Sequence, residues 1–220
     1  MILGLAQYLA AHRPARGKVH LLFQPAEETG TGAAAILADP AFASITPDLG
    51  IAIHNMPGYP MHSFVIKAGS ITAAVRSVVV RYQGRTAHAS EPEKGENPSL
   101  TIADLLRGCD ALNVHDISHP DFRLITPVHV RIGSIAYGVS AGDGEVHLTI
   151  RTVANTGLAA LQASITELAE SLGRRDRLTT SVEVVEDFFA NMNDPAVTEM
   201  VLAAAHECGF EVITPEVGLR

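Results

Sequence analysis

Phe23-Gln24-Pro25-Ala26-Glu27-Glu28 is the stretch of this chain that most strongly indicates its fold. An apolar run leads into it, and residues 18–24 are predicted to form a buried strand. Pro25 has no N–H group to donate to a sheet, so the strand is expected to end there. Glu27 and Glu28 then follow the carboxyl end of a strand, where sites form in open α/β sheets.

Glu27 and Glu28 admit two interpretations. Neighbouring carboxylates repel each other, so a pair in a crevice points to a nearby cation. One carboxylate could then bind a metal ion while the other acts as a general base toward water. Alternatively, both are solvated side chains at the start of a helix, where negative charge suits the helix dipole. The pair alone favours the solvated interpretation, and the rest of the chain reverses that preference.

Two histidines later in the chain, His54 and His88, are candidates for the same site. A second apolar strand, predicted over residues 49–54, ends in His54 just before a loop rich in proline and glycine. His88 lies in a polar, turn-rich segment, residues 84–98. A single histidine at a strand end is more often structural, half-buried with one hydrogen bond. A second strand end that carries a ligand type strengthens the metal-site interpretation.

Together these segments resemble the co-catalytic metallopeptidase and amidohydrolase family of aminoacylases, hippurate hydrolases and indole-acetyl-amino-acid hydrolases. The family pattern is FQPAEE at a strand end, a later histidine before a Pro/Gly loop, and a GKxxHAxxPxxGxNP motif. The last motif is matched by GRTAHASEPEKGENP, residues 84–98, and the resemblance covers essentially the whole chain.

The resemblance implies a role for each matched residue. Glu27 matches the catalytic general base, whereas Glu28 and His54 match ligands of two divalent metal ions, expected to be Zn²⁺ with Mn²⁺ or Co²⁺ as alternatives. His88 matches the histidine that hydrogen-bonds the substrate and stabilises the oxyanion, often in the active site of a partner subunit. The implied activity is metal-dependent hydrolysis of amide bonds in N-acyl amino acids or small peptide-like substrates, by a homodimer.

Two further residues concern substrate binding. Many relatives carry an asparagine near Gly138 that contributes to substrate recognition, and glycine has no side chain for this contact. Substrate is therefore recognised differently here, or the contact is lost. Arg151 ends an apolar strand, and it is expected to face either the substrate or a buried ion-pair partner.

The chain differs from members of this family at both of its ends. Relatives carry an upstream Cys-Gly-His-Asp-type segment that supplies further metal ligands, and they continue beyond the equivalent of Arg220. The chain therefore resembles the middle of such an enzyme and is expected to bind Zn²⁺ weakly or not at all. The alternative function is a truncated, catalytically incompetent dimerising or binding module of the same family.

The composition of the chain argues against certain classes of binding partner. The chain has 220 residues, is 47% hydrophobic, carries a net charge of −8 and has no tryptophan. Without a basic block or stacking platforms, neither nucleic acid nor an anionic membrane is an expected partner. Cys109 and Cys208 are expected to be free, buried thiols in a reducing compartment, which favours a cytoplasmic location.

The element order predicts an α/β fold with two domains. Residues 1–71 and 188–220 are expected to form a partial zinc-peptidase-like α/β catalytic domain, and 72–187 an inserted ferredoxin-like α+β dimerisation (lid) domain. His129 and His147 fall on its two central strands, where they are expected to pair, and Asp143-Gly144 favours a hairpin turn between them. The elements predicted for the inserted domain are strand 74–83, helix 98–113, strands 125–134 and 143–153, helix 156–173 and strand 179–188.

Overall fold

The structure is a computed structural model that describes residues 1–216 of the chain. Packing divides it into two compact units, residues 1–53 and the residues from His54 onward, and each is considered by itself. Both α-helices and β-sheets are present, in agreement with the predicted mixed α/β class.

The first unit contains only helices. They are α1 (Ile2–Ala11), α2 (Gly32–Ala38) and the 3₁₀ helix η1 (Phe42–Ser44). The strands predicted over 18–24 and 49–54 are wrong, because neither segment pairs with any part of residues 1–216. A strand requires a neighbour for its N–H and C=O groups. These segments have apolar sequences without such a neighbour, so side chains such as Phe23 and Ile51 are 60% and 61% exposed.

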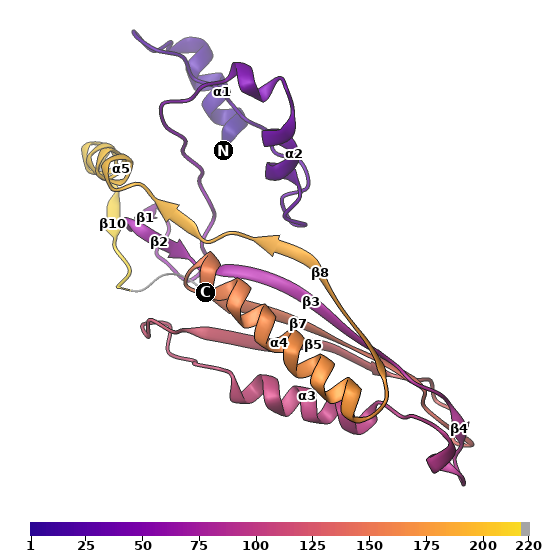
Figure 1. The fold of residues 1–220 in the computed structure, drawn as a ribbon. Helices are drawn as coiled ribbons and strands as arrows, with labels where there is room; N and C mark the ends of the chain where they lie inside the picture. Colours follow the sequence, from indigo (N-terminus) through magenta and orange to yellow (C-terminus); the bar gives the residue numbers. More distant parts are fainter. Residues whose placement is uncertain (217–220) are drawn as a thin grey trace. The chain divides into compact units, whose positions relative to one another are not determined.

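The second unit is built on a four-stranded antiparallel sheet with strand order β5-β7-β3-β8. Helices α3 and α4 cover one face of this sheet (Figure 1). Each of these elements lies within two residues of its predicted range, so this part of the prediction is confirmed. Their bounds are β3 (Ala74–Gln83), α3 (Ser99–Ala111), β5 (Arg123–Ile132), β7 (Asp143–Thr152), α4 (Asn155–Arg175) and β8 (Thr179–Phe188).

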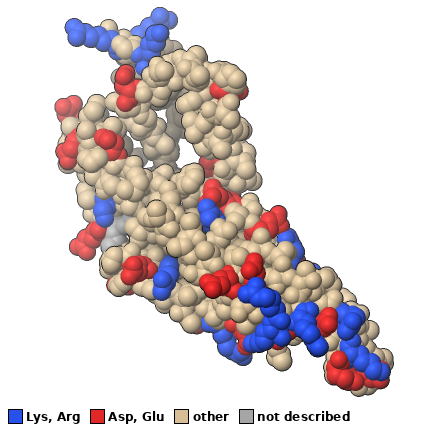
Figure 2. Space-filling model, viewed as in Figure 1, with Lys and Arg blue, Asp and Glu red and all other residues tan. Residues whose placement is uncertain are grey.

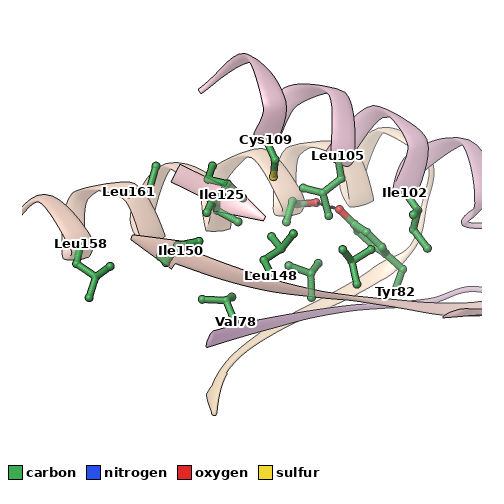
Figure 3. Close-up of a cluster of buried hydrophobic side chains, with 14 of the residues drawn as sticks. Val78, Tyr82, Ile102, Leu105, Cys109, Ile125, Leu148, Ile150, Leu158 and Leu161 are labelled. Atoms are coloured by element: carbon green, nitrogen blue, oxygen red, sulfur yellow. Dashed lines mark hydrogen bonds between the residues drawn. The ribbon is translucent and has the colours of Figure 1, made fainter. Parts of the chain in front are cut away.

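The core lies between the sheet and the two helices (Figure 3). Strand β7 shows why it forms there, since its residues alternate strictly between half-buried and buried positions. The apolar positions Val146, Leu148 and Ile150 are fully buried under the helices. The buried Tyr82 hydroxyl donates to the Ala169 carbonyl of α4 at 3.0 Å, so the one polar group of this ring is paired.

Both cysteines are free thiols, as predicted, but the predicted burial is wrong for Cys208, which is exposed near the end of α5 (Pro195–Glu207). Cys109 belongs to the core, where burial raises the pKa of its thiol to about 11. On the other face of the sheet, the rings of His129 and His147 lie 5.3 Å apart on β5 and β7, which confirms the predicted cross-strand pair.

The hairpin prediction for Asp143-Gly144 is wrong. Both residues belong to β7 and pair with Gln83 and Tyr82 of β3. Gly144 has a packing role instead, because a Cβ atom there would lie 2.6 Å from the Cδ1 atom of Ile102 in α3. Glycine thus permits close approach of helix and sheet rather than a turn.

Short elements complete the second unit. Three two-stranded sheets pair β1 with β10, β2 with β9, and β4 with β6. Helix α5 is capped by Asp194, whose carboxylate accepts from the Val197 N–H group at 3.0 Å. The bounds are β1 (Ser63–Val65), β2 (Gly69–Thr72), β4 (Ala87–His88), η2 (Pro92–Lys94), β6 (Val139–Ser140), β9 (Asn191–Asn193), α5 (Pro195–Glu207) and β10 (Glu211–Ile213).

Charged side chains are spread over the face of the molecule shown in Figure 2. Acidic and basic side chains are intermixed over its lower part, and a small group of basic side chains stands alone at the upper end. Within residues 1–216, every helix is too short or too polar to cross a membrane.

Gly173 in α4 offers a test of helix–sheet packing. A Cβ atom there would lie 1.9 Å from Oγ1 of Thr180, a buried hydroxyl without a hydrogen-bond partner among residues 1–216. We expect Gly173→Ala to lower the free energy of unfolding by about 1–3 kcal/mol through overpacking. Urea denaturation measures this change. Thr180→Ala should cost little alone and should rescue Gly173→Ala in the double variant; failure of this rescue would contradict the packing explanation.

Candidate active site

The Glu27-Glu28 pair lies on a tightly folded turn in the first unit. The Gly30 N–H group donates to the Glu27 carbonyl at 2.9 Å, and the Gly32 N–H group donates to the Ala26 carbonyl at 3.2 Å. A Cβ atom at position 32 would lie 1.6 Å from the Pro25 carbonyl oxygen, so only glycine fits there. The turn therefore holds the backbone of both glutamates, while their side chains are exposed.

The residue before Glu27 adopts an unusual conformation. Ala26 has φ +51°, in the left-handed region that residues with a Cβ atom rarely occupy. The Ala26 carbonyl also accepts from the Thr29 hydroxyl at 3.1 Å, which helps to hold this conformation. Such strained positions cluster at functional sites, so the outlier agrees with a functional role for the glutamates that follow.

His54 is held in a defined tautomer by the backbone next to it. Its Nδ1 atom lies 2.8 Å from the Asn55 carbonyl oxygen. A carbonyl can only accept, so Nδ1 of the neutral ring carries the proton and Nε2 keeps its lone pair. Metal-binding histidines commonly have this second-nitrogen contact to a carbonyl group. The exposed His54 ring therefore has the form that a metal ligand requires.

His88 lies on the two-residue strand β4, which pairs with β6. The Ala89 N–H group donates to the Gly138 carbonyl at 3.0 Å, just beyond this pairing. His88 and Gly138, both predicted site residues, are thus brought together by the structure. A Cβ atom at position 138 would meet no other atom within 4 Å, so packing does not require glycine there.

Other residues of the motif over 84–98 hold β4 and β6 in place through hydrogen bonds and close packing. Asn97 donates from Nδ2 to the Ser140 hydroxyl of β6 at 3.0 Å and accepts at Oδ1 from the Ser99 N–H group at 2.9 Å. It therefore links β6 to the first turn of α3. Gly95 allows the loop to close, since a Cβ atom there would lie 2.8 Å from the Arg85 carbonyl oxygen.

The tautomer of His88 is opposite to that of His54. The Ser90 N–H group points at Nδ1 of His88 at 3.2 Å, and an amide N–H group can only donate. Nδ1 must therefore accept, and the proton of the neutral ring lies on Nε2. His88 thus presents an N–H donor outward, as a group that binds a carbonyl oxygen or an oxyanion must.

Arg151 lies on the face of β7 opposite the helices, between Val75 and Leu124 on the neighbouring strands. It is half-buried and, among residues 1–216, its guanidinium makes no hydrogen bond or ion pair. The predicted alternative of a buried ion pair is therefore not found in the described chain. By contrast, Arg81 and Arg131 on the same face lie 2.6 Å from carboxylates of Glu183 and Asp143.

Arg151 and His88 lie near opposite ends of the sheet. β7 begins at Asp143, beside the loop that carries β6, and Arg151 is eight residues further along. At roughly 3.3 Å per residue, this separates Arg151 from the His88 end by about 26 Å. A single small substrate could not contact both side chains of one chain.

The described residues do not by themselves complete a metal site. Within residues 1–216, no three His, Cys, Asp or Glu side chains gather closely enough to hold a metal ion. Glu28 and His54 offer the right donor types for Zn²⁺, but zinc sites usually have three or four protein ligands. Glu27 and Glu28 belong to the first unit and the other predicted site residues to the second, so the two groups are described separately.

Sequence reasoning overlooked three residues of this region: Ser90, Asn97 and Ser140. Asn97 and Ser140 bond to each other from segments far apart in the chain. Ser90 instead contacts His88, two residues earlier. A serine two residues after a histidine is a local signal that could have been recognised, because serine often bonds to groups nearby in sequence.

Comparison with curated proteins finds bacterial deacetylases. N-acetyl-L-cysteine deacetylase from Bacillus subtilis is 27% identical over 215 residues, which is 97% of this chain and 51% of that enzyme. N-acetyldiaminopimelate deacetylase from Leuconostoc citreum is 27% identical over 220 residues, 98% of this chain and 56% of that enzyme. The chain therefore spans about half the length of these relatives.

Solved structures show the same fold. An aminobenzoyl-glutamate utilization protein from Klebsiella pneumoniae superposes with a TM-score of 0.77 at 21% identity, over 99% of this chain and 55% of that one. A dinuclear metal-binding peptidase of the M20 family from Bacillus subtilis gives a TM-score of 0.72 at 20% identity, over 100% and 55%. The family model of peptidase family M20/M25/M40 matches residues 1–219. The chain therefore belongs to peptidase family M20/M25/M40.

Proposed function

We propose that this protein takes part in the metal-dependent hydrolysis of the amide bond in N-acyl amino acids or small peptide-like substrates. The observation that carries the proposal is the opposite tautomers of His54 and His88. One ring offers a lone pair, which a metal ion requires, and the other offers an N–H group, which an oxyanion requires. The substrate class is supported by the names of the relatives, which are deacetylases of N-acetylated amino acids.

Each predicted residue then has a chemical task. The Glu27 carboxylate accepts a proton from the attacking water and passes it to the leaving amine. The Nε2–H group of His88 donates to the oxygen that gains charge in the tetrahedral intermediate. The guanidinium of Arg151, which has no ion-pair partner among residues 1–216, binds the carboxylate of the amino-acid part of the substrate. Two divalent ions, held by Glu28, His54 and ligands beyond these two, supply Lewis-acid polarisation when bound.

The non-catalytic alternative is less favoured. A binding module would have no need of a general base on a strained turn or of two histidines in opposite tautomers. The family match over residues 1–219 and the deacetylase names of the relatives also support an enzymatic role.

We further propose that the chain acts as a homodimer and that the site combines residues of two copies. His88 and Arg151 of one copy lie too far apart for one small substrate, so one of them would come from the partner. Residues 72–187 would then serve as the inserted dimerisation and lid domain. Residues 1–71 and 188–220, of which 217–220 lie outside the described residues, would belong to the catalytic domain, and we expect a cytoplasmic location.

The edge of the sheet indicates where a second copy pairs. Strand β5 is an edge strand, and Val128, Val130 and Ile132 on it are 60%, 40% and 36% exposed. Pro127 cannot donate, which limits pairing to the residues after it. The opposite edge strand, β8, carries charged side chains, which disfavour pairing with a further strand. The acidic ones are Glu183, Glu186 and Asp187. Two of them are paired within the chain, Glu183 with Arg81 and Asp187 with Arg76.

Metal binding by the 220-residue chain is the first test. Because Glu28 and His54 supply two ligands and zinc sites usually have three or four, isothermal titration calorimetry should detect weak binding of Zn²⁺ or none. Any weak binding should disappear in Glu28→Ala and His54→Ala and persist in Glu27→Gln, which keeps both ligands. Tight binding of two ions per chain would show that the chain holds a complete metal site.

Catalysis is tested in a chimera in which this chain replaces the matching half of the Bacillus subtilis N-acetyl-L-cysteine deacetylase. Release of acetate from N-acetylated amino acids is the measured activity. Glu27→Gln should retain metal but lower kcat by about 10²–10⁴-fold, since only the proton-transfer group is removed. His88→Ala should lower kcat by about 10²–10³-fold, the scale of one oxyanion donor. Near-normal turnover of the Glu27→Gln variant would rule out Glu27 as the general base.

Dimerisation is tested by light scattering at tens of micromolar, roughly where a modest interface saturates. Val130→Lys should convert the dimer to a monomer, because lysine on an edge strand opposes pairing. Val184→Lys on β8 is the matched control, since both valines are 40% exposed, and it should remain a dimer. In the chimera, mixing His88→Ala with Arg151→Ala should restore activity that each variant alone has largely lost. A monomeric wild-type chain, or no restoration, would contradict the shared site.

A further inference from the structure

Ser90 contacts the His88 ring through two of its groups. Its N–H group lies 3.2 Å from Nδ1, and its hydroxyl oxygen lies 2.7 Å from the same atom. Because the amide can only donate, Nδ1 accepts, and the hydroxyl must also donate to it. Both residues are exposed, so the arrangement is not imposed by burial.

We propose that Ser90 is a positioning residue that holds His88 with its Nε2–H group directed outward, toward the substrate. This inference rests on the proposed function of His88 as an oxyanion donor. The task is needed because β4 fixes only the backbone of His88. An exposed ring on a two-residue strand is otherwise free to rotate and to carry its proton on either nitrogen. The wrong tautomer would present a lone pair to a developing negative charge.

The turn after His88 aims the Ser90 amide at the ring. The Glu91 N–H group donates to the His88 carbonyl at 2.9 Å, which closes the turn. Lys94 then donates to the Glu91 carbonyl at 3.1 Å and leads into the rest of the loop. The backbone bond between His88 and Glu91 spans Ser90, so it sets the position of the Ser90 amide relative to the ring.

The chain contains a second copy of this turn without the hydroxyl. At His119, the Asp121 N–H group donates to Nδ1 at 3.1 Å, and the Phe122 N–H group donates to the His119 carbonyl at 2.9 Å. The histidine side chain is exposed in both turns. The two turns differ in the hydroxyl bond at His88 and in the residues that follow each histidine, Ala89-Ser90 against Pro120-Asp121. His119 therefore serves as a reference for a ring that accepts the backbone bond without a hydroxyl.

The test is long-range ¹H–¹⁵N NMR of the histidine rings in the ¹⁵N-labelled 220-residue chain at a pH where the rings are neutral. His88 of the wild type should show the Nε2–H tautomer. Ser90→Ala should shift the ratio of the two tautomers by about twofold to tenfold, the range that one net hydrogen bond supplies, toward the ratio seen for His119. Ser90→Thr keeps the hydroxyl and should preserve the wild-type ratio.

Two outcomes of this experiment would overturn the inference. One is the Nδ1–H tautomer at His88 of the wild type, and the other is an unchanged ratio in Ser90→Ala. The amide ¹H–¹⁵N spectrum of the same samples reports folding, and the His119 signals, remote in sequence from the substitution, serve as the internal reference.

Turnover of the chimera separates this inference from the proposed function. Ser90→Ala should lower kcat by about twofold to tenfold with KM unchanged, and it should have no further effect in a His88→Ala background. An equal loss in that background would show that Ser90 acts elsewhere and would overturn the inference. If His88→Ala left turnover intact while the NMR contact was present, the proposed role of His88 would fail instead.

Discussion

The register between β3 and β7 is the constraint on which the second unit depends. The two strands pair without a shift over ten positions, from Ala74 opposite Thr152 to Gln83 opposite Asp143. The ladder continues where the Gly84 N–H group donates to the Gly142 carbonyl at 2.7 Å. The loops that follow Gln83 and precede Asp143 therefore meet, and β4 can pair with β6. A slip of one residue would turn Val146 and Leu148 out of the core and would separate His88 from Gly138.

The sequence allowed the sheet and its helices to be predicted because one face of each element is buried. In β7, apolar and polar residues alternate along the strand, and this period is independent of any other part of the chain. The segments over 18–24 and 49–54 have apolar sequences too, but an apolar run does not specify a partner. Among residues 1–216, no segment lies beside them as a pairing partner, so neither forms a strand. The hairpin turn predicted at Asp143-Gly144 was wrong for a related reason, because glycine is used for close packing as well as for turns.

For the candidate site, the sequence identified residue types but not their chemical state. His54 and His88 were assigned different roles only through resemblance, and nothing in their residue type distinguishes them. The distinction arises from neighbouring groups: a carbonyl that accepts at Asn55 and an amide that donates at Ser90. Both are local contacts, within two residues of the ring, yet they depend on backbone dihedral angles that residue patterns do not report. The pairing of β4 with β6 is non-local, and so was the role of Asn97.

The length of the sheet links catalysis to association under the proposed function. A site that needs both His88 and Arg151 cannot assemble within one copy, because the strands that connect them are extended and stiff. Weakening the β5 edge would then lower activity without touching either side chain, and turnover per chain would fall on dilution. The same geometry explains why His88 needs a rigid setting. A donor that must enter the site of another copy gains no packing from its own chain. The orientation of its ring therefore has to come from the turn that carries it, through the amide and hydroxyl of Ser90.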